Sequence, residues 1–243
     1  MLVLSVGMPR AGSGWHYNLV HDLVVAGGGR DSREIRRTYL LFPVLTEVNC
    51  NIGALTSKRL LPVLLPSLLG NTFTVKAHAG PTPIALSLIQ KGLIRPAYIY
   101  RDPRAAMLSA YEYGQRGLED GHNTAFSHLK TIEQAIQFMI PYLHIWEQWV
   151  SCERALHVRY EDMLAYYDKE IDRLLPFLDL KKSPPIQDVI DKYRPGQTSR
   201  EDKGMHFHKG QPERFREVLT AKQLAACNKA FQPTLEMMGY QIE

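Results

Sequence analysis

Along this chain, short runs of apolar residues alternate with longer segments in which apolar residues recur every three or four positions. Apolar runs bounded by glycine or by polar residues are typical of buried strands, whereas the longer spacing is typical of helices with one buried face. The short runs predict strands over residues 2–6, 73–75, 97–100 and 156–158. The longer segments predict helices over residues 15–26, 56–69, 82–91, 103–116, 125–150 and 221–238.

Glycine and proline positions refine this outline. Glycines 27–29 are expected to stop the first helix, and Pro233 predicts a kink or a break in the last one. Residues 114–123 and 194–210 are expected to form loops. With 243 residues, of which 45% are hydrophobic, the chain is long enough for a sizeable core in a single domain, residues 1–243.

Strands that alternate with helices predict an α/β fold in which helices cover both faces of a parallel sheet. Ligands bind such sheets beyond the carboxyl ends of the strands. Basic residues follow three of the predicted strands, namely Lys76, Arg101 and Arg159, and His78 lies two residues beyond Lys76. We therefore expect a positively charged binding site at this edge of the sheet.

The segment between the first predicted strand and helix holds Gly7 and Gly12 at the spacing of a phosphate-binding P-loop. Such a loop turns backbone N–H groups and the positive end of the following helix toward an anion. In ATP-using enzymes a lysine and a serine or threonine follow the last glycine, whereas this chain has Ser13 and Gly14 there. The cation lies inside the loop instead, at Arg10.

An ATP-using site also needs an acidic residue that holds magnesium. The third predicted strand ends at Arg101, followed by Asp102 and Pro103. An aspartate directly before a proline is typical of the N-cap of a helix, so Asp102 is better explained as a cap than as a metal ligand. A small-molecule kinase that uses ATP through a divergent P-loop stays as the alternative function, with little support.

Five segments of the chain resemble, in the same order, the motifs of sulfotransferases that use 3′-phosphoadenosine 5′-phosphosulfate (PAPS). These segments are MPRAGSGW, VKAHAG, YIYRDPRAAMLSAYEY, VRYEDML and FHKGQPERFREVLT. The resemblance covers nearly the whole chain. It implies the fold of the cytosolic-type members, a P-loop-like three-layer α/β/α arrangement around a central parallel sheet of about four to five strands. It also implies PAPS as the donor, 3′,5′-adenosine bisphosphate (PAP) as the product, and no metal.

The activity that the resemblance implies is transfer of the sulfuryl group of PAPS to a hydroxyl or amine of a small-molecule acceptor. Arg10 occupies the place of the family's lysine and would stabilise charge on the leaving phosphate. His78 would be the general base that takes the acceptor's proton, since a neutral imidazole suits that step near pH 7. Lys76 would add positive charge near the sulfonate.

The resemblance also implies a set of donor-binding residues. Arg101, Ser109, Lys209 and Gly210 would hold the 3′-phosphate, while His208 stands where the family commonly has arginine. Trp15 would stack on adenine and Tyr160 would contact the same ring, with burial in the core as the alternative for both residues. The full donor-binding set is Pro9, Arg10, Ala11, Gly12, Ser13, Gly14, Trp15, Arg101, Ser109, Tyr160, His208, Lys209 and Gly210.

Composition adds weaker constraints. The formal net charge of +4 fits a protein that binds anionic small molecules and does not by itself indicate nucleic acid, although a non-catalytic module that binds nucleotide or RNA stays open. Three scattered cysteines favour a reducing compartment over a disulfide framework or a zinc site. The first apolar run is too short for a signal peptide, and none reaches the roughly 18 residues of a membrane span, so a cytoplasmic location is expected.

Overall fold

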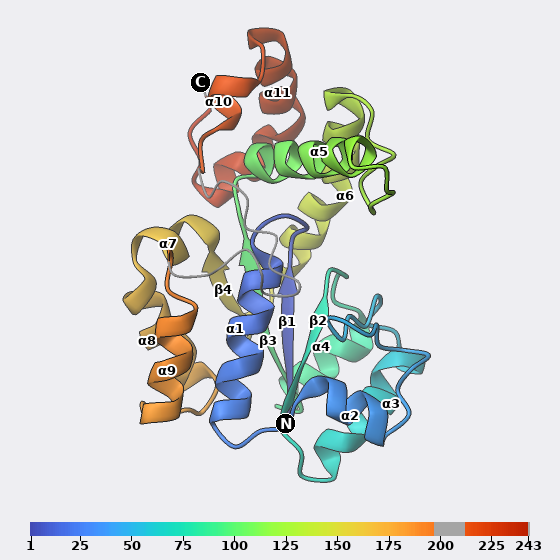
Figure 1. Cartoon of the computed structure of the whole chain (residues 1–243), viewed down its shortest axis with the longest axis vertical. Helices are drawn as coiled ribbons and strands as arrows, with labels where there is room; N and C mark the ends of the chain where they lie inside the picture. The colour runs from blue at the N-terminus through green and yellow to red at the C-terminus, as the bar shows by residue number, and fades with distance from the viewer. Residues whose placement is uncertain (197–211, 243) are drawn as a thin grey trace.

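A four-stranded parallel sheet forms the centre of the computed structural model, which describes residues 1–196 and 212–242 (Figure 1). The strands lie in the order β2-β1-β3-β4, and every pair of neighbours is parallel. Their bounds are β1 Leu2–Gly7, β2 Phe73–Ala77, β3 Ile94–Tyr100 and β4 Leu156–Arg159. All four predicted strands are confirmed, and the largest difference is that β3 begins at Ile94 instead of residue 97.

Helices cover both faces of the sheet, which confirms the predicted α/β class (Figure 1). One face carries α1 (Ser13–Ala26), α7 (Tyr160–Ala165), α8 (Tyr167–Phe177) and α9 (Pro184–Lys192). The other carries α2 (Ser32–Thr38), α3 (Ser57–Leu68), α4 (Pro83–Gln90) and α6 (Ile132–Val150). The carboxyl ends of the strands point toward α5 (Pro103–Glu119), α10 (Phe215–Val218) and α11 (Ala221–Met238) (Figure 1).

The alternation of side chains along β1 divides the core into two apolar clusters. Leu2, Leu4 and Val6 pack in the cluster that includes residues of α3, α4 and α6. Val3 packs on the opposite face, among residues of α1, α8 and α9. Because successive side chains of a strand point to opposite faces, a strand that is apolar at nearly every position must be buried on both sides. This explains why the strands appear in the sequence as continuous apolar runs.

Several helix boundaries agree with the sequence. The first helix ends at Ala26, where Gly27 is its C-cap, as predicted. Asp102 caps α5 through a hydrogen bond from the Arg104 backbone N–H to its carboxylate (2.9 Å), as its position before Pro103 predicted. The last helix continues through Pro233 to Met238, so the proline does not end it.

Two predicted boundaries near the middle of the chain are wrong. The helix expected from residue 125 begins at Ile132, because the side chain of Thr131 accepts a hydrogen bond from the backbone N–H of Gln134 and caps the helix there. The loop expected from residue 114 is helical up to Glu119. Gly114 lies inside this helix because the backbone of Phe126 packs directly against it and leaves no space for a Cβ.

In the described part of the chain, five helices were not predicted by the apolar pattern, namely α2, α7, α8, α9 and α10 (Figure 1). All of them are short, although α8 carries helically spaced apolar residues at Ile171, Leu174 and Leu175. Among the described helices, none has both the length and the apolar character that a membrane span requires.

Candidate functional site

The carboxyl edge of the sheet brings together residues that are far apart in the sequence. β1 leads into the loop that holds Arg10, β2 into His78, β3 into Arg101 and β4 into Tyr160. Ser5 of β1 pairs with Lys76 of β2, so these two side chains point to the same face of the sheet. The predicted convergence at this edge is therefore a consequence of the parallel topology.

The loop after β1 has a conformation that depends on Gly12. Its φ of +79° lies in the left-handed region, and a Cβ placed on it would lie 2.6 Å from the ring of Tyr160. The backbone N–H of Met8 donates to the Ile99 carbonyl (3.1 Å), which ties the loop to β3. Arg10 also has a positive φ, of +63°, which is uncommon for a residue other than glycine.

The N-terminus of α1 faces the same region. Its N-cap residue is Gly12, and in the described part of the chain no side chain caps this end and no acidic residue lies in its first turn. The first backbone N–H groups of a helix have no acceptors inside the helix, and the helix dipole makes this end positive. Ser13, Gly14 and Trp15 therefore belong to a helix end that suits an anion.

Contacts on α5 and the following loop hold the side chain of Arg10. Its Nε donates to the hydroxyl of Ser109 (3.2 Å), and its guanidinium carbon lies 4.4 Å from the centre of the Tyr113 ring. Phe126 lies somewhat farther away, at 5.9 Å. Burial lowers the pKa of Arg10 to about 10, and the nearby Arg116 contributes to this decrease. The guanidinium nevertheless keeps its charge at neutral pH.

Positive groups from separate elements lie within electrostatic reach of one another. Burial is the main cause that lowers the pKa of Lys76 to about 8, and the charge of Arg10 lowers it further. Arg101 in turn contributes to the lowered pKa of Arg10. Like charges that approach one another in a buried region raise the energy of the folded state unless an anion joins them. The site is therefore suited to a ligand with several negative charges.

His78 is oriented by the loop itself. Its Nδ1 lies 2.6 Å from the carbonyl oxygen of Gly7. Because a carbonyl can only accept, Nδ1 must carry the proton, and the lone pair of the neutral ring lies on Nε2. Burial, with a further contribution from Lys76, lowers the pKa of His78 to about 4. The imidazole is thus neutral at physiological pH and able to accept a proton at Nε2.

Arg101 and Tyr160 meet beside the loop. The guanidinium carbon of Arg101 lies 4.5 Å from the centre of the Tyr160 ring, and the same ring is the one that excludes a Cβ at Gly12. Arg101 is nearly buried, with 9% of its surface exposed. Tyr160 therefore supports both the loop backbone and a cation of the site.

Trp15 lies deeper than the other predicted residues. It is 4% exposed, and its indole N–H donates to the carbonyl of Tyr193 (3.0 Å). Its ring is stacked with that of Tyr167 and meets that of Tyr160 edge to face, with centroid distances of 6.2 and 6.1 Å. This is the arrangement of a core residue, the alternative that the sequence left open for Trp15.

The carboxylate of Asp102 is engaged by Arg104, which donates to it from Nε (3.0 Å) and from Nη2 (2.7 Å). Arg104 is buried and also donates to Asn228 on α11 (2.9 Å). A carboxylate held in this way serves the fold, which supports the interpretation of Asp102 as a cap. In the part of the chain that the structure describes, no group of three acidic, histidine or cysteine side chains is arranged to hold a metal ion.

The structure also assigns residues to the site that sequence reasoning missed. Tyr113 and Arg116 follow Ser109 on α5 at four and seven positions, which is the spacing of a single helix face. This periodicity could have identified them once Ser109 was selected. Ser109 itself contacts Arg10, whereas the sequence grouped it with Arg101. His208, Lys209 and Gly210 lie outside the described residues.

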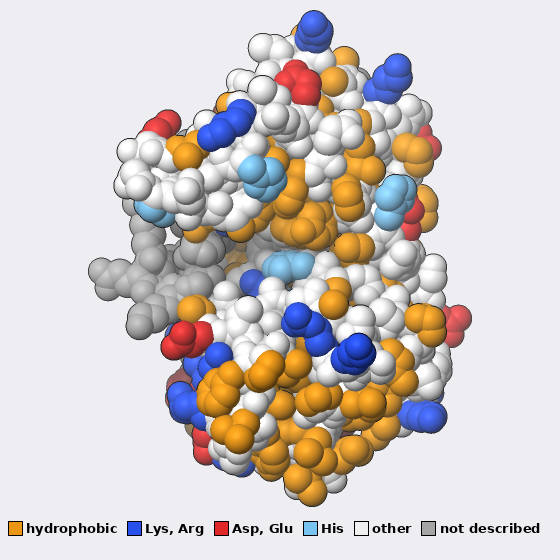
Figure 2. Space-filling view, turned by 90° about the vertical axis from the view of Figure 1, so that its right-hand side faces the viewer, with side chains coloured by type: hydrophobic (Ala, Val, Ile, Leu, Met, Phe, Trp, Pro, Cys, Tyr) orange, Lys and Arg blue, Asp and Glu red, His pale blue; other side chains and the backbone are white. Residues whose placement is uncertain are grey.

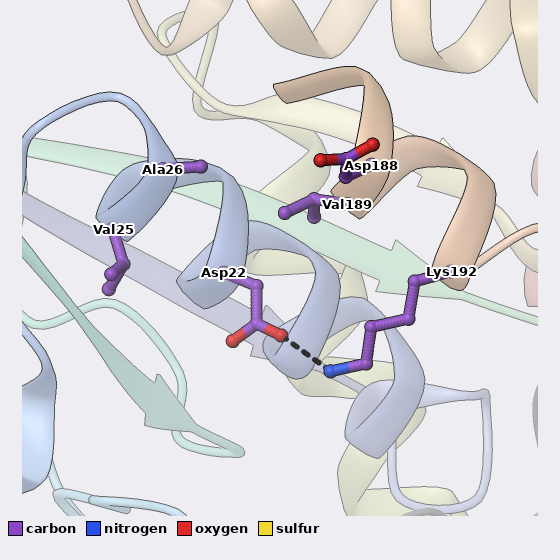
Figure 3. A pocket seen from close by; sticks show the side chains of 6 residues that line it. All are labelled: Asp22, Val25, Ala26, Asp188, Val189 and Lys192. Atoms are coloured by element: carbon purple, nitrogen blue, oxygen red, sulfur yellow. Dashed lines mark hydrogen bonds and ion pairs between the residues drawn. The ribbon is translucent and has the colours of Figure 1, made fainter. Parts of the chain in front are cut away.

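A separate pocket of about 300 Å³ lies between α1 and α9, away from the loop (Figure 3). Val25, Ala26 and Val189 form its apolar lining. Two of the charged residues beside it, Asp22 and Lys192, form an ion pair with a distance of 3.0 Å. The two charges of this pair neutralise each other, and the pocket lies near the C-terminal end of α1, whereas the glycine loop lies at its N-terminal end. We therefore do not assign the pocket to the site.

Solved structures with the same fold are sulfotransferases and related proteins. A retinol dehydratase in complex with androsterone and the inactive cofactor PAP superposes with a TM-score of 0.58 at 17% identity, covering 97% of this chain and 80% of that one. A retinol dehydratase in complex with retinol and PAP gives 0.61 at 16% identity, with coverages of 97% and 81%. Mouse sulfotransferase SULT7A1 complexed with PAP gives 0.60 at 11% identity, with coverages of 97% and 84%.

Comparison of the sequence with curated proteins gives no significant match. A model of the sulfotransferase domain, in contrast, matches residues 2–239, which is nearly the entire chain. The matched region includes the glycine loop, the basic strand ends and the segment that leads into α11. The chain therefore belongs to the sulfotransferase family.

Proposed function

We propose that this protein transfers the sulfuryl group of PAPS to a hydroxyl or amine of a small-molecule acceptor. The observation that carries the proposal is the convergence of Arg10, Lys76 and Arg101 on a loop whose backbone also presents a helix N-terminus. PAPS carries phosphates at both ends of its ribose and a sulfonate, so it matches a site with several positive groups. The three structural neighbours described above, which were crystallised with PAP, support the same donor.

On the donor side, Arg10 would stabilise the charge that grows on the bridging oxygen when the bond from sulfur to the 5′-phosphate breaks. Its contacts with Ser109 and Tyr113 fix its position before the reaction. An arginine keeps its proton, so it would act by charge and leave protonation of the phosphate to solvent. The phosphate itself would lie against the loop from Pro9 to Gly14 and the first turn of α1.

On the acceptor side, Nε2 of His78 would take the proton of the attacking hydroxyl while the new oxygen–sulfur bond forms. The hydrogen bond from Nδ1 to Gly7 supports this role because it leaves the basic nitrogen at Nε2. The bound donor is negatively charged, so it would raise the low pKa of His78 and make the ring a stronger base once the complex has formed. Lys76 would stabilise the sulfonate oxygens.

The remaining donor contacts follow from position and from the family motif. Arg101 would hold the 3′-phosphate together with Ser109, Lys209 and Gly210, and with His208 in the place of the usual arginine. Tyr160 would border the adenine, and Trp15 would support the Tyr160 ring from the core. Two of the neighbours are complexes with retinol and with androsterone, which supports an apolar alcohol as the first acceptor class to examine.

Thermal unfolding with added nucleotides tests the choice of donor. PAP should raise the unfolding temperature more than ATP with magnesium does, because the site offers cations for two separate phosphates and Asp102 is already engaged by Arg104. A larger shift with ATP and magnesium would contradict the proposal and favour the kinase alternative.

A turnover assay with sulfur-labelled PAPS tests the reaction itself. Pools of phenols, aliphatic alcohols and amines should include at least one class that receives label from the wild-type protein. His78→Ala should still bind PAP but lose nearly all transfer of label. If His78→Ala transfers label to an acceptor class as fast as the wild-type protein does, the assignment of His78 as the base is wrong.

A further inference from the structure

Helix α3 has apolar residues on two of its sides. Leu60, Val63 and Leu64 are buried against the core. Leu61, Leu65 and Leu68, followed by Leu69, point away from it and are 55%, 50%, 60% and 64% exposed. The first three are spaced by four and three residues, so they form a single line along the helix, which we call the leucine stripe together with Leu69. Scattered exposed leucines are ordinary, whereas a continuous stripe marks an interaction surface.

The leucine stripe continues into an apolar surface formed by neighbouring elements. Leu86 on α4 and two residues after α2, Leu40 and Phe42, are also exposed. The end of α2 lies close to the end of α3, because Asn71 donates to the hydroxyl of Tyr39 (3.0 Å) and to the carbonyl of Pro66 (2.9 Å). Figure 2 shows hydrophobic side chains gathered over the lower part of this face, with lysine and arginine side chains among them.

The charges along α3 and α4 have one sign. No aspartate or glutamate occurs between Glu47 and Asp102, a segment that contains all of α3 and α4. Lys58 is exposed and lies three residues before Leu61, in line with the leucine stripe, and Lys91 is exposed directly after α4. Glu34 and Glu47, in contrast, are exposed in the segments before Leu40 and after Phe42. The part of the surface formed by α3 and α4 is therefore bordered by cations, which is complementary to an apolar partner bordered by anions.

We infer that the leucine stripe and Lys58 dock this protein on a membrane surface that contains anionic lipid. The leucines would enter the boundary between headgroups and acyl chains, while the lysines pair with lipid phosphates, as in helices that lie in the plane of an interface. A second copy of the chain fits this surface poorly, because a two-fold contact would place like charges opposite one another. The inference does not depend on which acceptor the enzyme uses.

Vesicle co-sedimentation of the full chain tests the inference. The wild-type protein should bind vesicles of phosphatidylcholine mixed with phosphatidylserine, bind pure phosphatidylcholine more weakly, and lose affinity at high salt. Leu61→Gln/Leu65→Gln/Leu68→Gln should weaken binding to the mixed vesicles by at least about tenfold, since each leucine loses its apolar contact. Glutamine keeps the helix propensity of leucine, so α3 should persist.

Two further variants separate docking from folding. Val218→Gln/Met237→Gln changes exposed apolar residues on α10 and α11, and it should bind mixed vesicles as the wild type does. Lys58→Glu should weaken binding on the order of tenfold because it reverses one charge at the surface. It should not disturb α3, since a negative charge near a helix N-terminus is favourable. Thermal unfolding of each variant checks that it is folded.

Three outcomes would overturn the inference. The wild-type protein could fail to bind the mixed vesicles, or the triple glutamine variant and Lys58→Glu could bind them as well as the wild type does. The third is that the wild type does not bind vesicles but forms a dimer, measured by light scattering, whereas the triple glutamine variant stays monomeric. In that case the leucine stripe would be a contact between two copies of this chain.

Discussion

At the scale of single residues, Arg10 shows why the loop carries an arginine. A lysine at this position would have no planar group to lie over Tyr113 and no Nε to donate to Ser109. The guanidinium can make both contacts and still present Nη groups in the fork that matches phosphate oxygens. Its position is thus fixed by the protein before charge develops in the reaction, and this is the condition for effective electrostatic stabilisation.

Substitutions at Arg10 should separate charge from position. We expect Arg10→Ala to lower kcat on the order of 100- to 1,000-fold, because the stabilising charge is lost mainly in the transition state. Arg10→Lys should recover only part of that loss. Single-turnover rates and PAP affinity would be measured for both variants, with exposed Arg37→Ala as the control. Equal losses in PAP affinity and in turnover would contradict a role specific to the transition state.

The titration of His78 and Lys76 predicts the pH dependence of the enzyme. The pKa of His78 is lowered to about 4, so kcat/KM should rise with pH through that value as the base becomes neutral. The pKa of Lys76 is lowered to about 8, so kcat/KM should fall above that pH as the ammonium loses its charge. Lys76→Arg should move the upper limb to higher pH. An unchanged upper limb in this variant would show that another group titrates there.

The residues of the site were accessible to sequence reasoning to different degrees. His78 and Arg101 could be found because each directly follows a strand, and the ends of parallel strands must meet. Arg10 could be found as the cation inside the glycine loop after β1. The contact between Ser109 and Arg10 could not, since it depends on the angle at which α5 crosses the edge of the sheet. The burial of Trp15 likewise depends on α8 and α9, helices that the apolar pattern did not predict.

At the scale of elements, the turn from β1 into α1 is defined by Gly12. Two constraints require a glycine there, namely the left-handed backbone conformation and the lack of space for a Cβ. Comparison with a second glycine of similar conformation separates them. Gly12 and Gly28 have φ values of +79° and +93°, but only at Gly12 would a Cβ meet another residue, the ring of Tyr160. Gly28 therefore reports the cost of the backbone conformation alone.

We expect Gly28→Ala to lower the free energy of unfolding by about 1 kcal/mol, the usual cost of a left-handed conformation for alanine. Gly12→Ala should cost more, by about 1–3 kcal/mol, because the Tyr160 ring must also move. It should weaken PAP binding, whereas Gly28→Ala should not. Urea unfolding and calorimetric titration would measure these quantities, and similar costs for both variants would mean that Tyr160 adapts without strain.

Element boundaries show where local sequence information ends. The stop of α1 was predictable from the run of glycines 27–29, since Gly28 adopts the left-handed φ, +93°, that commonly follows the last residue of a helix. The extension of α5 to Glu119 was not, since Gly114 appeared as a loop signal but is required for packing against Phe126. The sequence does not show whether a glycine is present to form a turn or to allow a close tertiary contact. Only the three-dimensional structure distinguishes the two cases.

At the scale of the whole molecule, one buried arginine connects the sheet to the C-terminal helices. Arg104 binds Asp102 at the end of β3 and Asn228 on α11, and its guanidinium lies over the ring of Phe215, 4.6 Å from the ring centre. Removal of one partner from a buried ion pair leaves a charge without compensation. This network therefore fixes α10 and α11 relative to the end of β3.

Acid should destabilise the whole fold through its buried histidines. The pKa values of His78 and His16 are lowered by burial to about 4 and about 3, below the ordinary value of 6.5. Between these values the unfolded chain holds more protons than the folded one, so stability is present above about pH 6.5 and is lost as the pH falls. Each histidine should contribute a slope of up to about 1.4 kcal/mol per pH unit.

Urea unfolding between neutral and mildly acidic pH measures this slope. His78→Gln should reduce it, because an imidazole whose pKa is lowered in the folded protein is removed. The matched control is His122→Gln, since His122 is exposed and should leave the slope unchanged. An identical slope in the wild type and in His78→Gln would show that His78 does not contribute to acid unfolding.

The hydrogen bond between His78 and the Gly7 carbonyl couples the effects of mutations in the loop to those of mutations at His78. The orientation of the His78 ring and the geometry of the loop both depend on the Gly7 carbonyl, so a mutation that displaces this carbonyl disturbs both at once. Mutations in the loop and at His78 should then be epistatic, and their combination should be less harmful than the sum of the single effects. Suppressors of a loop mutation are accordingly to be sought in the segment around β2 that positions His78.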